Sequence, residues 1–505
     1  MINPVSRGET WHRPARGGHP DPLKMLGYVW PVVEDLRAKP PEDWPSPDAL
    51  TDALVELAEW FEEAGWDDFA LRTHEEVLEF RREAGDAEKL RRVLTLMRDN
   101  LMRQERHEEA LAIVQEELPL AQQLAVPGEY STEIANVARY WITNLLGKLG
   151  RHAEAADNAR EAVAELHGQV PSQHGPPPGY GLTNARLEYA HRLTTIGDYE
   201  QAADFTAQSA EFWRQNGSWR GINGYNAYDE LGLLQLRLGR FEEARASAIA
   251  AVAILRQHAE SEGDSDTLRN HADALHNHGN RLADLGLDQE ALEAAQESTH
   301  RYRELLANTE GRAMIMKMEL RVALSLVSLG TRLRAVGRLD ESLAASDEAI
   351  ELATKHEDRE LGRKELARAW TNRASLLISR QAYPEAANAA AKSIELSQTA
   401  DGKAMARNTF ALASAHAGEL GIAVETSLAA VAHYREQHAA DPYEYSYYLA
   451  DALADHALIR VLRAERAEAE AAISESLAMY AELAAHNPGR YQRELDHARG
   501  VAARI

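Results

Sequence analysis

One motif recurs along the chain and restricts its fold more than any other feature. It consists of a helix-like stretch, a short turn of the form Gly-x-x-x-Glu-Ala and a second helix-like stretch, and residues 274–307 and 452–485 are the clearest copies. The Ala of the turn, once replaced by Ser, marks ten copies about 40 to 50 residues apart: Ala70, Ala110, Ala155, Ala202, Ala244, Ala291, Ser342, Ala386, Ala423 and Ala469. Such self-similarity is typical of a solenoid, in which every unit buries its apolar face against its neighbours.

Small residues occur where the two helices of a copy would cross. Glycines lie five positions before several markers, where a left-handed residue would end the first helix: Gly65, Gly150, Gly197, Gly239, Gly286 and Gly337. A second small set lies twelve positions before the markers: Ala58, Ala190, Gly232, Gly279, Gly330, Ala374 and Ala457. The pattern predicts ten helix pairs in which the second helix crosses the first at close range.

This order of small residue, aliphatic residue, glycine turn and alanine resembles the tetratricopeptide repeat, from about residue 50 to 486. The chain is most similar to the long-period arrays of bacterial, particularly actinobacterial, proteins. The resemblance implies an all-α, right-handed α-solenoid, or superhelix, of about ten helix-turn-helix repeats. Two features depart from the family pattern. The spacing exceeds the standard 34 residues, and the usual Trp of the first helix occurs at Trp370, while Leu54, Leu275 and Leu453 replace it elsewhere.

The repeats divide the chain into five predicted segments. Residues 1–48, rich in Pro, Gly and Trp, are expected to form an irregular arm with a capping helix at 23–38, or else an arm that binds a partner. Repeats one to three follow at 49–169, a Pro-rich loop at 170–181, repeats four to ten at 182–486 and a capping helix at 487–505. Three consecutive prolines make the loop a candidate hinge, and WRGING at 219–224 is expected to interrupt the helices again.

Composition excludes several classes of function. The net charge is 55 − 80 = −25, which disfavours direct nucleic-acid binding because phosphate contacts need clustered Lys and Arg. The chain has no cysteine, so disulfides, thiolate metal sites and cysteine nucleophiles are excluded. No apolar run approaches a membrane span, and the first thirty residues lack a signal-peptide core. A cytoplasmic location with no membrane partner is the expectation.

The sequence also lacks a recognisable catalytic or cofactor motif. It has no phosphate-binding loop, no His-Glu-x-x-His and no Gly-x-Ser-x-Gly elbow. His271, His276 and His278 are spaced by five and two residues, so they do not share one helical face and are not expected to hold a metal. We therefore expect a protein that is not an enzyme and carries no cofactor.

The candidate binding residues follow from the family resemblance, which implies that first helices line a concave groove. Polar residues at its inward positions are Asn144, Asn184, Glu188, Asn226, Asp229, Asp273, Asn277, Asn280, Asn372 and Ser375. An amide side chain both donates and accepts hydrogen bonds, which suits the backbone of an extended peptide. The alternative is that a solvated groove is simply polar. Because several of these residues are acidic, a basic or neutral ligand is favoured over an acidic one.

A tyrosine cluster at 443–448 is the second candidate surface. Tyr443, Tyr445, Tyr447 and Tyr448 open the tenth repeat, and tyrosine is enriched at protein interfaces. We expect two of them to pack between repeats nine and ten, with a homodimer contact as the alternative.

Together these observations predict a non-catalytic scaffold that binds a protein segment or peptide in its concave groove. The alternative is a sensor whose superhelix changes pitch when a small ligand or peptide binds. Neither prediction identifies the partner.

Overall fold

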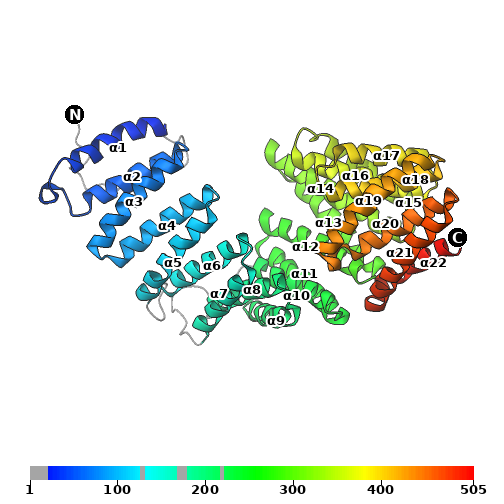
Figure 1. Cartoon of the computed structure of the whole chain (residues 1–505), viewed down its shortest axis with the longest axis horizontal. Helices are drawn as coiled ribbons and strands as arrows, with labels where there is room; N and C mark the ends of the chain where they lie inside the picture. The colour runs from blue at the N-terminus through cyan, green and yellow to red at the C-terminus, as the bar shows by residue number, and fades with distance from the viewer. Residues whose placement is uncertain (1–20, 126–130, 168–178, 217–220) are drawn as a thin grey trace. The chain divides into compact units, whose positions relative to one another are not determined.

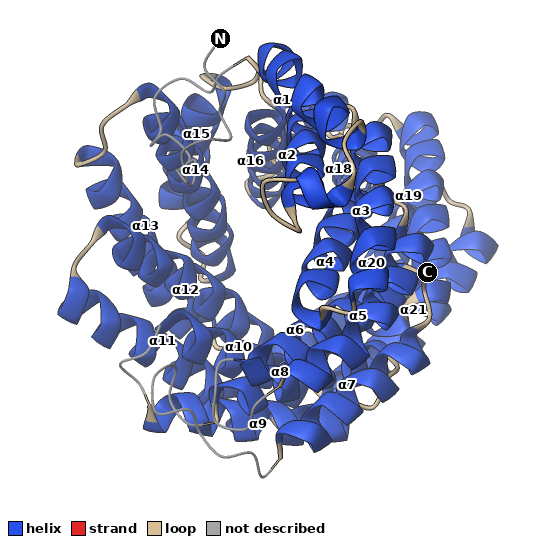
Figure 2. Cartoon of the chain, turned by 90° about the vertical axis from the view of Figure 1, so that its left-hand side faces the viewer, coloured by secondary structure: helices blue, strands red, loops and turns tan. Residues whose placement is uncertain are grey.

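The computed structural model describes residues 21–125, 131–167, 179–216 and 221–505. These ranges contain α-helices and one short 3-10 helix, and no strand (Figures 1 and 2). The all-α solenoid expected from the repeat is confirmed, because ten successive helix pairs follow one another between α2 and α21.

The N-terminal helices are α1 (Pro22–Arg37), η2 (Pro41–Asp43), α2 (Ala49–Glu63), α3 (Asp67–Ala84), α4 (Ala87–Arg103), α5 (His107–Leu124), α6 (Ser131–Lys148), α7 (His152–Leu166), α8 (Tyr180–Thr195) and α9 (Tyr199–Gln215). The next are α10 (Gly221–Arg237), α11 (Phe241–Glu262), α12 (Ser265–Asp284), α13 (Asp288–Ala307), α14 (Arg312–Ala335) and α15 (Leu339–Thr354). The last are α16 (Glu360–Ser379), α17 (Tyr383–Leu396), α18 (Ala400–His416), α19 (Leu420–Ala440), α20 (Pro442–Leu462), α21 (Arg466–His486) and α22 (Pro488–Ala502).

The chain divides into two compact parts, Met1–Phe212 and Trp213–Ile505. We refer to them as the N-terminal part and the C-terminal part. In each pair the even-numbered helix is the first and the odd-numbered helix is the second. Every first helix packs on its own second helix or on the second helix before it, as expected for a stack of paired helices.

The turns within the pairs have the geometry that the glycines predict. Gly286 has φ +77°, and the amide of Leu287 donates to the Leu282 carbonyl at 2.8 Å, which closes the last turn of α12. Three pairs place a residue other than glycine in the left-handed conformation: Glu105, Gln381 and Ala464. The turn is therefore fixed by the stacking even where its preferred residue is absent.

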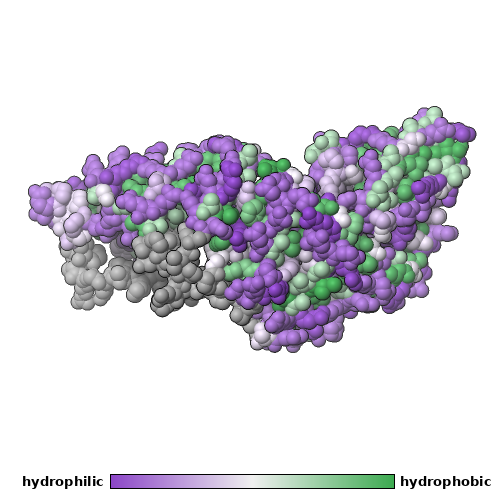
Figure 3. All heavy atoms as spheres, turned by 90° about the horizontal axis from the view of Figure 1, so that it is seen from below, coloured by the Kyte–Doolittle hydropathy of each residue, from purple (hydrophilic) through white to green (hydrophobic). Residues whose placement is uncertain are grey.

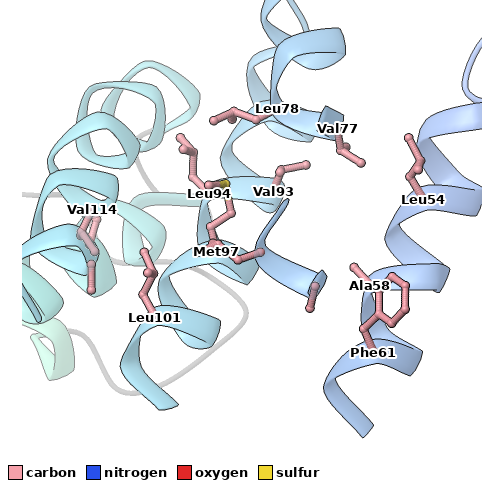
Figure 4. Packing of buried hydrophobic residues seen from close by; sticks show 14 of the residues in the cluster. Leu54, Ala58, Phe61, Val77, Leu78, Val93, Leu94, Met97, Leu101 and Val114 are labelled. Carbon is pink, nitrogen blue, oxygen red and sulfur yellow. The ribbon is translucent and has the colours of Figure 1, made fainter. Parts of the chain in front are cut away.

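The marker residues lie at the helix crossings. All ten markers are at most 2% exposed, and the Ser342 hydroxyl donates to the Gly330 carbonyl across the crossing at 2.7 Å. Around the crossings, aliphatic side chains fill the spaces between successive helices. Figure 4 shows this core in the N-terminal part, where Leu54, Val77, Leu94 and Met97 come from three helices.

Two segments were predicted to interrupt the helices. The expected interruption at 219–224 is wrong for its last four residues, because α10 already begins at Gly221; residues 217–220 lie outside the described ranges. A Cβ at Gly224 would lie 3.3 Å from Ile254 Cδ1 and Trp213 Cβ, so this glycine permits close packing within a helix. Residues 170–178 of the predicted Pro-rich loop also lie outside the described ranges, and α8 starts at Tyr180.

Helices flank the array at both ends. α1 packs on α2 and buries Val33 and Leu36, while α22 packs on α21 and buries Leu495 and Val501. No described helix is long and apolar enough to cross a membrane. The face seen in Figure 3 is largely hydrophilic, with apolar residues scattered over it.

Candidate functional site

The first helices of the C-terminal part form a layer of their own. α10, α12, α14, α16, α18, α20 and α22 each pack on the next member of this series. Among the described residues, no two successive second helices pack to a comparable extent. Because the inner layer of a curved stack is the more crowded one, the first helices form the inner side. We call the exposed face of these helices the inner wall.

The predicted asparagines of the C-terminal part mostly join neighbouring first helices. Asn277 Nδ2 on α12 donates to Tyr225 Oη on α10 at 2.7 Å. Asn280 Oδ1 accepts from Arg332 Nη2 on α14 at 3.0 Å. Each of these amides therefore uses one of its two polar atoms to join neighbouring helices of the wall.

Asn372 forms hydrogen bonds with both polar atoms of its side chain. Its Nδ2 donates to the Val327 carbonyl at 3.1 Å, and its Oδ1 accepts from Thr331 Oγ1 at 3.2 Å. The residue is only 7% exposed. Asn372 therefore lies between α14 and α16, behind the surface that a ligand would meet.

The predicted acidic residues are largely neutralised by neighbours. Asp273 accepts from the Tyr302 hydroxyl and from Arg321 Nη1, the latter at 2.7 Å. Asp229 faces Arg281 at 3.6 Å, and burial raises the pKa of its carboxyl above the usual range. These two carboxylates therefore do not give the inner wall a net negative charge, because each has an arginine beside it.

The other predicted residues are distributed over both parts. In the C-terminal part, Asn226 is exposed and Ser375 is half-buried. In the N-terminal part, Asn144 is half-buried on α6 and Asn184 is exposed on α8. Glu188 accepts from Arg192 Nη2 at 2.6 Å. The structure thus brings together on one layer those predicted residues that lie beyond residue 221.

Exposed apolar side chains also occur on the inner wall, at positions that were not among the predicted binding residues. Leu233 on α10 is 37% exposed and Met405 on α18 is 43% exposed. Both stand at inward positions of the repeat, eleven residues before Ala244 and eighteen before Ala423. Peptide and ligand sites commonly combine such apolar contacts with a few polar groups.

Two further carboxylates were missed, although the repeat could have revealed them. Asp451 and Asp455 precede Ala469 by eighteen and fourteen residues, which are the same inward positions as Asp273 and Asn277 in the sixth pair. Burial raises the pKa of Asp451, and burial together with the charge of Asp451 raises that of Asp455 well above its usual range. The position of both residues in the repeat is visible in the sequence, where they follow the tyrosine cluster at 443–448.

Those tyrosines pack within the chain. Tyr448 stacks on Tyr434 of α19 with ring centroids 5.7 Å apart, and Tyr445 donates to Asp401 at 3.1 Å, so two of the four pack between pairs nine and ten. Tyr447 contacts Tyr480 and Tyr491. Tyr443 is 48% exposed and lies under the Arg237 guanidinium at 4.2 Å. A homodimer through this region remains an untested prediction.

The C-terminal end of the chain returns to the start of the C-terminal part. Asn487 Nδ2 donates to the Asp284 carbonyl at 2.8 Å, and Arg490 Nη1 donates to the Ala283 carbonyl at 2.9 Å. His486 lies against the Leu236 carbonyl and the Phe241 ring. These contacts join the tenth pair and α22 to the turns of the fifth and sixth pairs. The C-terminal part is therefore a closed superhelical turn, and we call these contacts the closure.

The histidines of α12 are poor candidates for acid–base chemistry near neutral pH. Burial lowers the pKa of His276 to about 4, and burial also lowers those of His271 and His278. No group of three His, Asp or Glu side chains suited to a metal occurs in the described part of the chain.

Comparisons with known proteins give limited guidance. No protein-family model and no curated protein matches the chain. Among solved structures, the apo form of RapI is similar with a TM-score of 0.49 and 14% identity, covering 76% of this chain and 97% of RapI. The apo form of the quorum sensor NprR from B. thuringiensis gives a TM-score of 0.44 and 12% identity, covering 79% of this chain and 99% of NprR. These similarities are too weak to carry an argument about function, which must come from the residues of this chain.

Proposed function

We propose that the inner wall of the C-terminal part binds a basic or neutral protein segment in an extended conformation, without catalysing a reaction on it. One observation carries the proposal: the layer of first helices exposes the apolar side chains of Leu233 and Met405 and also carries accessible polar groups such as Asn226 and Ser375. A partner that covers these side chains with apolar groups would remove apolar surface from water and so stabilise the complex.

The amides that fix the wall also support this function. Because Asn277, Asn280 and Asn372 tie neighbouring first helices together, the exposed groups stand on a rigid frame. A preorganised surface loses less conformational entropy when a ligand binds. In our proposal these three asparagines therefore position the helices of the wall, and other residues contact the peptide.

Met405 offers a direct test with a matched control. Met405 on the first helix α18 is 43% exposed, and Leu428 on the second helix α19 of the same pair is 45% exposed. The experiment measures retention of a random peptide library, with blocked ends, on immobilised full-length protein. We expect Met405→Asp to reduce retention at least about tenfold, as loss of an apolar anchor would, and Leu428→Asp to leave it unchanged.

Equal effects of the two substitutions would contradict the proposal, because the inner and outer layers would then be equivalent. The proposal is also contradicted if the unmodified protein retains no more peptide than the Met405→Asp variant does. Melting temperatures of both variants check that the comparison concerns folded protein.

A second candidate function is favoured by the closure. A sensor needs two conformations that a ligand distinguishes, and a closed turn can change pitch only if the contacts of Asn487 and Arg490 break. A ligand on the inner wall that binds better to the open turn would release α22 for another partner. This role rests on the same wall and differs from the scaffold in predicting movement of α22.

A further inference from the structure

Asp451 and Asp455 are two carboxylates on the inner wall; Arg334 on α14 and His497 on α22 face Asp451, but neither forms a salt bridge with it. The two carboxylates lie one turn apart on α20, so both face the same side of the helix. Asp451 accepts from the Tyr480 hydroxyl at 3.4 Å, and Asp455 accepts from Asn408 Nδ2 at 2.8 Å. Neither forms an ion pair with a described residue. In this they differ from Asp273 and Asp284, which contact Arg321 and Arg490.

Asn408, next to this pair of carboxylates, has a buried hydrogen-bond acceptor without a donor. The residue is 8% exposed, and its side chain points to Asp455. Its Oδ1 is buried and has no hydrogen-bond partner. A buried acceptor without a partner is costly and rare. A group that donates several hydrogen bonds would satisfy Asn408 Oδ1 and the carboxylate next to it together.

Aromatic rings border the same place. Tyr447, one turn before Asp451, contacts Tyr480 with ring centroids 6.4 Å apart and Tyr448 at 5.5 Å. The faces of tyrosine rings attract cations. The Arg490 guanidinium already lies 5.8 Å from the centre of the Tyr447 ring. The two carboxylates and the unpaired amide oxygen are therefore the groups that a further ammonium or guanidinium would contact.

We propose that Asp451, Asp455 and Asn408 bind one basic side chain, lysine or arginine, of the segment held on the inner wall. This inference rests on the proposed function and specifies where its preference for a basic ligand arises. The cation would lie between the two carboxylates, with Asn408 Oδ1 as a further acceptor.

The charged and titratable groups around the pair set its pH dependence. Tyr480 on α21, Arg334 on α14, and Glu494 and His497 on α22 face Asp451, while Asp451 itself faces Asp455. Because both carboxyl pKa values are raised, the pair becomes fully ionised only at higher pH. Binding of a cation should therefore be strongest in alkaline buffer and weaken as the pH falls.

The test compares two peptide libraries on immobilised full-length protein. One has a central lysine and the other a central norleucine, with four randomised residues on each side and both ends blocked. We expect the protein to retain the lysine library about tenfold better at pH 8, with a smaller preference at pH 5.5. In Asp451→Asn with Asp455→Asn, this preference should vanish while retention of the norleucine library stays the same.

A charge-matched control is Glu425→Gln with Glu436→Gln, two exposed positions on α19, which should keep the preference. The Asn variant should melt no lower than the unmodified protein, since it removes two desolvated like charges. If the Asp451→Asn, Asp455→Asn variant melts at a lower temperature than the unmodified protein, the two carboxylates have a structural role and the inference is overturned. If the protein retains both libraries equally, and more of each than the Met405→Asp variant does, this inference alone is overturned. If it retains neither library, the proposed function is overturned as well.

Discussion

His74 lies on α3 with no exposed surface, and neither ring nitrogen has a hydrogen-bond partner among the described residues. Burial, with a smaller contribution from Arg103, lowers its pKa to about 4 from the usual 6.5. Between these values the unfolded chain binds a proton that the folded chain excludes. Stability from this residue is therefore complete above pH 6.5 and is lost as the pH falls towards 4.

We predict that the free energy of unfolding falls by about 2 kcal/mol through His74 between pH 7 and pH 5. His74→Leu should remove this part of the pH dependence, because leucine takes up no proton. Urea unfolding at the two pH values measures it, with His152→Leu on the exposed start of α7 as the control. A pH dependence that is the same in His74→Leu and in the unmodified protein would show that the buried ring is not responsible.

The residue scale also shows where sequence reasoning about the site was sufficient and where it failed. The repeat placed Asp273, Asn277 and Asn280 on the inner layer, where the structure has them. It could not show that Asn277 would bond to Tyr225 or Asn280 to Arg332, because those partners lie about 50 residues away on other helices. Lateral contacts depend on how far each helix is rotated, and a one-dimensional pattern does not contain that angle.

At the scale of the element, the turn between the two helices of a pair is the feature most fully predicted. Gly286 and Gly337 adopt the positive φ that their position implied. The same conformation at Ala464, with φ 62°, was not predicted, because alanine rarely adopts it. The stacked helices on both sides fix this turn, so tertiary packing overrides the local preference there.

Ala464→Gly should therefore stabilise the protein. Relief of the left-handed strain is worth about 1–2 kcal/mol, and the greater freedom of glycine in the unfolded chain offsets about half of it. We expect a net gain of about 0.5–1 kcal/mol in thermal or urea unfolding.

The control is Ala417→Gly, at the end of α18, where φ is −76°. Alanine is unstrained in that conformation, so Ala417→Gly should lower the stability of the protein by a similar amount. If both substitutions shift stability in the same direction, backbone strain at Ala464 is not the cause.

At the largest scale that the structure defines, the C-terminal part closes on itself. No local pattern predicted this, because closure depends on small rotations that accumulate over six helix pairs. The contact is tight at Gly286, where a Cβ would overlap the Gly489 carbonyl. The equivalent Gly337 of the next pair has nothing within 4 Å of a Cβ. Both glycines have nearly the same φ, +77° and +80°, so they form a matched pair.

We predict that Gly286→Ala opens the closure and that Gly337→Ala does not. Each substitution costs about 1–2 kcal/mol of backbone strain, but only the first adds a clash with α22. Hydrogen exchange of residues 487–493 in full-length protein should accelerate about tenfold or more in Gly286→Ala alone. Equal protection in the two variants would mean that the closure does not depend on this approach, and the sensor role would lose its basis.

The central claim is that a bound segment lies on the inner wall formed by the first helices of the C-terminal part. Its most direct test is photo-crosslinking of a library-selected peptide that carries a central photoreactive residue, followed by mass spectrometry of the full-length protein. The account predicts adducts on α10, α16, α18 and α20, near Asn226, Leu233, Ser375, Met405 and Asp451. Adducts confined to second helices such as α11, α17 and α19 would contradict it.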